Sequence, residues 1–172
     1  WPATWGDNVV NYGMDPDIVT RAPWGGTISN DLRSIPTLSL VMRLGDLFDA
    51  QTGIYANAGG EGRDWERPCS LELIYPDGRE GFAVRAGIRV RGGFSRTTSN
   101  PKHSLRFIMR EEYGDGKLRF PFFGPTGAAA FDKFDLRTSQ DGSWAFLGDP
   151  NGLFLNDPFA RDTLLAMGQP GE

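Results

Sequence analysis

The sequence predicts an α+β fold: an antiparallel, meandering sheet with few helices. Segments with strand periodicity follow one another with only turns between them, and the best helical pattern occurs once, near the C-terminus. Strands and helices do not alternate, so the order differs from that of a parallel α/β sheet. We therefore expect sequential strands to pair with one another.

The first third of the chain predicts few regular elements. Residues 1–35 are rich in Gly, Pro, Asn and Asp and indicate an irregular lead-in with one helical turn near residues 16–19. The apolar run at residues 36–42 predicts a buried strand. Residues 45–48 favour a short helical turn, and residues 51–68 are predicted to form a long loop.

The middle of the chain predicts a hairpin and a third strand. Residues 69–75 and 82–91 have strand patterns, and Pro76-Asp77-Gly78 between them is typical of a turn. A Gly/Ser/Thr-rich loop at 92–101 follows, and then a strand that runs to Arg110.

Two later segments differ in strand character. Residues 120–125 contain two prolines and cannot form a central strand, because proline donates no backbone hydrogen bond. Residues 131–137 alternate like a strand, and residues 138–151 are predicted to form a polar loop.

The best helix is predicted at residues 158–168. Asp157 is a suitable N-cap and Pro158 suits the first helical position. Gly168 is a typical residue at a helix end.

Composition limits the classes of function. The chain has 172 residues and a formal net charge of −4, whereas a nucleic-acid-binding domain is typically basic, so we expect no nucleic-acid partner. No run approaches the roughly 18 apolar residues of a membrane span. The N-terminus lacks an initiator Met and does not resemble a signal peptide, so we expect a piece of a longer protein.

Cations gather on one face of the two strands that flank the 92–101 loop. Successive side chains of a strand point to opposite faces, so Arg85, Arg89 and Arg91 lie opposite an apolar row. If the strands pair, one surface collects the following cations: Arg89, Arg91, Lys102 and Arg106. Gly92 and Gly93 let a ligand approach the backbone closely, and hydroxyls come from Ser95, Thr97, Thr98 and Ser99.

This arrangement has more than one interpretation. Like charges repel, so the cations indicate either an anionic ligand such as phosphate or acidic neighbours from another part of the fold. An ordinary solvated sheet face is the third possibility, because Arg is common there.

The single cysteine and the single histidine are interpreted as structural. Cys69 belongs to a predicted strand, and His103 lies on the apolar side of its strand. A zinc site rich in Cys and His is excluded by these counts. Five acidic residues are candidate metal ligands, but nothing in their spacing is diagnostic of a metal site, and we interpret them as solvated loop or cap carboxylates: Asp132, Asp135, Asp141, Asp149 and Asp162.

The chain resembles the spore-coat protein H (CotH) kinase family of bacteria. The matching segments occur in order through most of the sequence: residues 11–17, 35–41, 53–55, 65–68, 88–93, 101–106, 113–115, 134–137, and Arg161-Asp162 on a helix that ends with residues 167–170. Residues 36–172 would then be the amino-terminal part of the kinase domain.

The resemblance implies an atypical protein-kinase-like fold that transfers phosphate from ATP to protein hydroxyls with Mg²⁺. Arg91, Gly92, Gly93 and Ser95 match the family's glycine-containing loop. Residues 102–106 match a Lys-Lys-Ser-like segment, in which Lys102 would contact the phosphates of ATP. The nucleotide site implied in this way comprises Arg91, Gly92, Gly93, Ser95, Lys102, Ser104 and Arg106.

The resemblance also has departures. The family domain continues beyond the last helix, into the segment with the catalytic and metal-binding acids, so those residues stay unknown here and the fragment is expected to be inactive. His103 stands where many relatives have Lys or a small residue. The family further implies a protein substrate, the rest of the parent chain as a partner, and an extracellular, cell-surface or spore-coat location.

Two other functions remain open. Five Trp residues and a β-rich pattern also suit a non-catalytic carbohydrate- or protein-binding module, which would require several exposed Trp in a shallow groove. A pseudokinase that keeps the fold without activity is the other.

Overall fold

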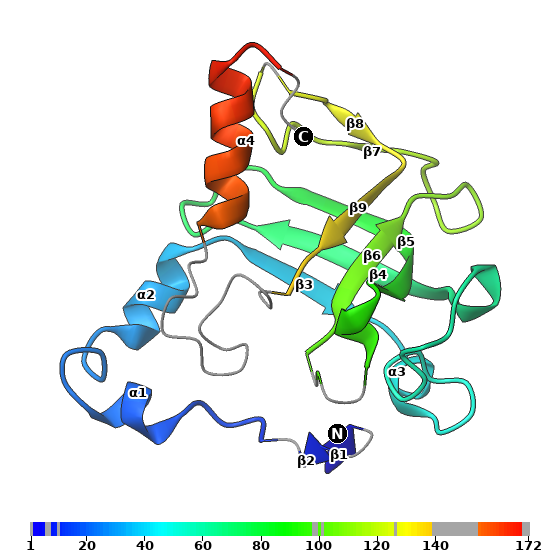
Figure 1. Ribbon diagram of the computed structural model, residues 1–172, viewed down its shortest axis with the longest axis horizontal. Coiled ribbons are helices and arrows are strands. Elements are labelled where there is room, and N and C mark those ends of the chain that lie inside the picture. The colour runs from blue at the N-terminus through cyan, green and yellow to red at the C-terminus, as the bar shows by residue number, and fades with distance from the viewer. Residues whose placement is uncertain are drawn as a thin grey trace. The chain divides into compact units, whose positions relative to one another are not determined.

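The computed structural model describes residues 2–5, 8–9, 11–97, 100, 102–125, 127–138 and 155–169, without the side chains of Trp5 and Asn8. The chain divides into two units, Trp1–Leu136 and Arg137–Glu172, and each is described by itself. Figure 1 shows the ribbon.

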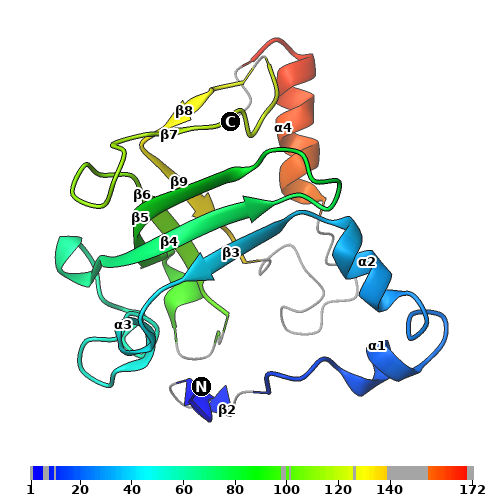
Figure 2. The same cartoon turned by 180° about the vertical axis from the view of Figure 1, so that it is seen from behind.

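A five-stranded antiparallel sheet forms the centre of the first unit. The strand order is β3-β4-β5-β6-β9, so β5 is central and β3 and β9 are at the edges (Figures 1 and 2). The strands are β3 Thr37–Val41, β4 Arg67–Ile74, β5 Phe82–Arg91, β6 Ser104–Ile108 and β9 Lys133–Leu136. The predicted α+β class with a meandering antiparallel sheet is confirmed.

Most predicted strands lie where the period-two pattern placed them. β5 has the predicted bounds, and β4 is only slightly shifted. Gly78 has φ 75°, the left-handed conformation that glycine allows in the turn between them. Residues 120–125 are not assigned to a strand, as their prolines predicted.

The shorter elements of the first unit are β1 Thr4–Trp5, β2 Asn8–Val9, α1 Pro16–Thr20, α2 Ile28–Ser34, α3 Leu44–Phe48, η1 Arg63–Trp65, η2 Phe94–Arg96, β7 Leu118–Arg119 and β8 Ala130–Phe131. The turns predicted near residues 16–19 and 45–48 correspond to α1 and α3. The helix α2 was not predicted, because only Ile28 and Leu32 of its seven residues are apolar, too few to form a detectable apolar stripe.

The hydrophobic core covers one face of the sheet. Ile88 and Phe107 are opposite each other on β5 and β6, and both are completely buried. Leu71 of β4 extends this row, and Phe134 of β9 packs against Phe107 with ring centroids 5.1 Å apart. The opposite face of the same strands is therefore the one that carries polar side chains.

The second unit contains the helix α4 Asn156–Ala166. The predicted cap is wrong: the N-cap is Leu155, which has no side-chain cap bond, and Asp157 lies in the first turn and pairs with Arg137. Asp157 thus places negative charge near the helix N-terminus without being the cap. Gly168, with φ 73°, follows the helix end as predicted. No helix in the described ranges is long and apolar enough to cross a membrane.

Candidate anion-binding site

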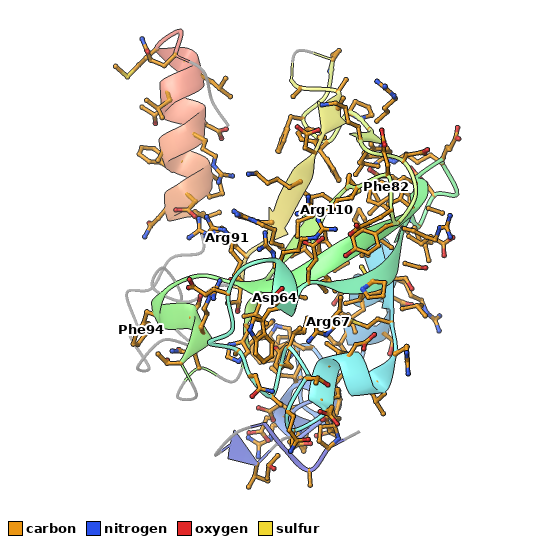
Figure 3. All side chains as sticks on the ribbon, turned by 90° about the vertical axis from the view of Figure 1, so that its right-hand side faces the viewer. Asp64, Arg67, Phe82, Arg91, Phe94 and Arg110 are labelled. Carbon is orange, nitrogen blue, oxygen red and sulfur yellow. The ribbon has the colours of Figure 1, made fainter. Side chains whose placement is uncertain are left out.

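The sheet register brings three of the four predicted cations together on the polar face, while Lys102 precedes β6 and has no register partner. Arg89 lies directly opposite Arg106 across β5 and β6, and Arg91 lies opposite Ser104. The predicted pairing of these strands and the merging of their polar faces are confirmed. Arg91 and Arg110, which lies just beyond β6, are labelled in Figure 3.

Asp135 of β9 holds two of these arginines. Its Oδ1 accepts from Arg106 Nε at 2.6 Å and its Oδ2 accepts from Arg106 Nη2 at 2.9 Å. The same Oδ2 lies 2.5 Å from Arg91 Nε. Partial burial opposes ionisation of Asp135, but these arginines, together with Lys133, give it a net pKa below the usual value. Asp135 is thus a partly buried strand carboxylate, which corrects the expectation of a solvated loop or cap residue.

Glu66 holds the other pair of arginines. Its side chain is only 1% exposed, and its Oε1 accepts from Arg110 Nε at 2.7 Å. Its Oε2 lies 3.6 Å from Arg89 Nε. Burial would raise the pKa of Glu66, but hydrogen bonds from Arg110 and Tyr113 and the charge of Arg89 lower it overall. Burial, with the nearby carboxylates, raises the pKa of Tyr113.

Four guanidinium groups therefore share two carboxylates. Acidic neighbours from distant parts of the chain, one of the interpretations that the sequence left open, are observed. Neither Glu66 nor Asp135 was assigned this role from the sequence, and Arg110 was not included in the predicted site. These four arginines and two carboxylates together retain an excess of positive charge, although the chain is acidic overall.

The start of the 92–101 loop is anchored at several points. Gly92 has φ 121°, and a Cβ there would lie 1.8 Å from the Ser95 hydroxyl oxygen, so only glycine fits. Ser95 Oγ donates to the Arg91 carbonyl at 3.2 Å. Arg96 donates to the carbonyl oxygens of Gly60 at 3.2 Å and Val90 at 3.1 Å. Thr98, Ser99 and Pro101 lie outside the described residues.

His103 is a structural residue, as predicted, and lies directly before β6. Only 9% of it is exposed, its Nδ1 is 2.7 Å from the Ser95 carbonyl oxygen, and its ring packs on Tyr55 at 4.8 Å. Burial lowers the pKa of His103, and the charge of Arg96 adds to this effect. The ring therefore joins the loop to the core in its neutral form.

Lys102 and Ser104 have different environments. Ser104 is 7% exposed, which places it largely beneath the surface. Lys102 is exposed, and among the described residues no hydrogen bond or ion pair involves its ammonium group. Lys102 is thus the one member of the predicted cation set that the described carboxylates do not hold.

The described residues do not assemble a metal site. No group of three or more His, Cys, Asp or Glu side chains suited to a metal occurs among them, and Asp135 is engaged by two arginines. Asp141 and Asp149 lie outside the described part of the chain. Cys69 is buried in β4, and burial raises the pKa of its thiol to about 12, so the structural interpretation of Cys69 holds.

A platform of several exposed tryptophans is not seen among the described side chains. Trp24 is 52% exposed, whereas Trp65 is partly buried and has the Arg67 guanidinium 5.7 Å from its ring centroid. The side chains of Trp1, Trp5 and Trp144 are outside the described set.

Comparison of this chain with family models, curated proteins and solved structures gives no match. The class that the structure defines is therefore an α+β protein with an antiparallel sheet and a basic polar face.

Proposed function

We propose that this chain is the amino-terminal, nucleotide-binding part of a kinase of the spore-coat protein H type. Such a protein transfers phosphate from ATP to protein hydroxyls. Support comes from the ordered sequence resemblance, from the antiparallel α+β sheet, and from the basic face next to the glycine-containing loop. The extracellular or spore-coat location rests on the same resemblance and stays a prediction.

This proposal depends mainly on the environment of Lys102. Its ammonium group is exposed and has no counterion among the described residues, while four arginines on neighbouring strands share two carboxylates. Such an excess of positive charge attracts a polyanion. A lysine without a carboxylate partner can bind phosphate without first breaking an ion pair.

The arginines have a different role from Lys102 in this proposal. Asp135 occupies both Nε and Nη2 of Arg106, so Arg106 contributes mainly through its electric field. Asp135 engages Arg91 at Nε. Among the described residues no hydrogen bond or ion pair uses the Nη groups of Arg91, whose side chain remains 44% exposed. Arg91 can thus add a hydrogen bond to a phosphate oxygen, with Gly92 and Gly93 allowing close approach of the backbone.

Mg²⁺ belongs to the proposed activity through the family resemblance alone. The described acidic residues do not fit a metal ion, so no step is assigned to one here. The base that would accept the proton of the substrate hydroxyl is likewise unassigned, and binding of ATP is the part of the activity that this chain can be tested for.

The test is isothermal titration of ATP, with and without Mg²⁺, into the 172-residue chain. We expect Lys102→Ala to weaken binding about tenfold, equivalent to about 1.4 kcal/mol. Lys117→Ala is the matched control, because Lys117 is also a surface lysine but pairs with Asp132 at 2.7 Å. Equal affinities for the wild type and Lys102→Ala would remove Lys102 from the site.

A non-catalytic role is the second candidate, whether as a pseudokinase or as a binding module. It is favoured by the ion pairs themselves, because Glu66 and Asp135 give the four arginines a structural explanation that needs no ligand. ATP that fails to bind the wild-type chain would support this candidate.

A further inference from the structure

The polar face of the sheet is hollowed on the side away from β9, toward β3. Ser39 of β3, Ser70 of β4 and Ala83 of β5 have small side chains, and they line a hollow of about 420 Å³. Val41 and the turn at residues 114–115 also border it. None of the residues of the candidate anion site lines this hollow, so it is a separate feature of the same face.

Three charged side chains border the hollow. Glu72 lies opposite Ser39 on one side and opposite Ala83 on the other, and Asp115 and Arg85 lie nearby. Among the residues that the structure describes, none forms a hydrogen bond or an ion pair with any of these three side chains. The two carboxylates outnumber the guanidinium, so the hollow is suited to a group with positive charge.

The strand beside the hollow has an open edge. β3 is the first strand in the sheet order, and no strand of the described ranges pairs with its outer side (Figure 2). Backbone N–H and C=O groups at such an edge can pair with an added strand. An added residue beside Ser39 would face the hollow, whereas its neighbours would face the half-buried Leu38 and Leu40.

We propose that the outer edge of β3 binds an extended, basic peptide segment of a partner protein. The peptide pairs with Thr37–Val41, and one of its Lys or Arg side chains crosses the small Ser39 to reach Glu72. Neighbouring strands are about 4.8 Å apart, so a peptide residue beside Ser39 lies roughly 10 Å from Glu72, a distance that extended Lys and Glu side chains together span. Backbone pairing supplies affinity, and the hollow supplies specificity.

This interaction does not depend on ATP binding. Arg85 borders the hollow and Arg91 belongs to the anion site, and these residues are six positions apart on β5, or about 20 Å. The hollow beside the β3 edge therefore lies on the same face as the anion site but is distinct from it. If either peptide binding or ATP binding fails, the other can still be tested.

The experiment uses a labelled nonapeptide of alternating Thr and Val with one central Lys, and a matched peptide with central Glu. Fluorescence anisotropy with the 172-residue chain should show binding of the Lys peptide and at least tenfold weaker binding of the Glu peptide. Glu72→Lys should reverse this preference. Glu80→Lys is the control, because Glu80 is exposed, carries the same charge and does not line the hollow.

Hydrogen exchange locates the bound peptide. Amides of Thr37–Val41 should exchange more slowly with the Lys peptide present, and the amides of β9, the other edge strand, should not change. Any of three results would overturn the proposal. The Lys peptide could fail to bind, the protected amides could be those of β9 instead of β3, or Glu72→Lys could keep the same peptide preference as Glu80→Lys.

Discussion

Gly87 shows how closely single residues determine the polar face. It lies on β5 next to the buried carboxylate of Glu66, and a Cβ there would be 2.5 Å from Glu66 Oε1 and 2.6 Å from Tyr113 Cε2. Neither neighbour can move without losing hydrogen bonds to the arginines or to the other. The absence of a side chain at Gly87 thus leaves the space that the Glu66 carboxylate and the Tyr113 ring occupy.

We expect Gly87→Ala to lower the free energy of unfolding by about 2 kcal/mol, because overpacking a well-filled site typically costs 1–3 kcal/mol. Urea denaturation measures the change. Gly59→Ala is the control, since a Cβ at Gly59 meets nothing within 4 Å. Similar destabilisation by both substitutions would show that the contact with Glu66 is not the cause.

Glu66 itself is the second residue that can be tested singly. Replacing it with Gln leaves the guanidinium groups of Arg89 and Arg110 without their carboxylate, and breaking a buried ion pair costs about 3 kcal/mol. Glu61→Gln is the matched control: Glu61 pairs with Arg96, but its side chain is 78% exposed, so the loss should stay within about 1 kcal/mol. Equal losses in urea denaturation would mean that the burial of Glu66 is unimportant.

At the scale of elements, His103 connects the start of β6 to the loop that precedes it. Its ring contacts the Ser95 carbonyl and Tyr55, and its backbone N–H donates to the Tyr55 hydroxyl at 3.1 Å. The pKa of His103 is lowered in the folded chain, so below about pH 6.5 the unfolded chain binds more protons. Protonation therefore weakens the junction between the loop and the strand.

The free energy of unfolding should consequently fall between pH 7.5 and 5.5. His103→Gln should remove most of this slope, because the chain has no other histidine. Urea denaturation at three pH values in this range measures it for both proteins. A slope that persists unchanged in His103→Gln would assign it to another group.

At the scale of the whole molecule, the sequence predicted which face of the sheet a side chain occupies better than it predicted the ion-pair partner of that side chain. Period-two alternation predicted β5 and the arginine side of the β5–β6 pair, because side chains that alternate on a half-buried strand leave a clear pattern. The carboxylates were not predicted, because Asp135 lies 29 residues after Arg106 and Glu66 lies 44 residues before Arg110. Alternation assigns a residue to a face, but it does not reveal which distant strand lies alongside.

The same reasoning applies to the helices. α2 was missed because it is short and has only two apolar residues, Ile28 and Leu32. The start of α4 was shifted because its N-cap, Leu155, is not a capping residue type. Gly168, in contrast, was predicted correctly, because the left-handed backbone conformation that follows a helix end favours glycine and is a local property of the chain.

The two carboxylates that hold the four arginines, Glu66 and Asp135, predict how the first unit responds to acid. Glu66 and Asp135 both have pKa values below the ordinary 4.5 and 3.8 in the folded chain. An acid whose pKa is lowered by folding contributes its stability above the ordinary pKa, and this contribution is lost as the pH falls through the folded value. Stability should therefore decrease steadily below about pH 4.5, in addition to the change caused by His103.

The double variant with Glu66→Gln and Asp135→Asn tests this expectation. It should be less stable than the wild type at pH 7 but should lose less stability on acidification, and thermal unfolding from pH 7 to pH 3 measures both effects. Asp49, whose pKa is lowered by hydrogen bonds from the backbone of Thr52 and Gln51, retains part of the slope in the double variant. Parallel curves for the wild type and the double variant would show that the arginine–carboxylate network does not control acid stability.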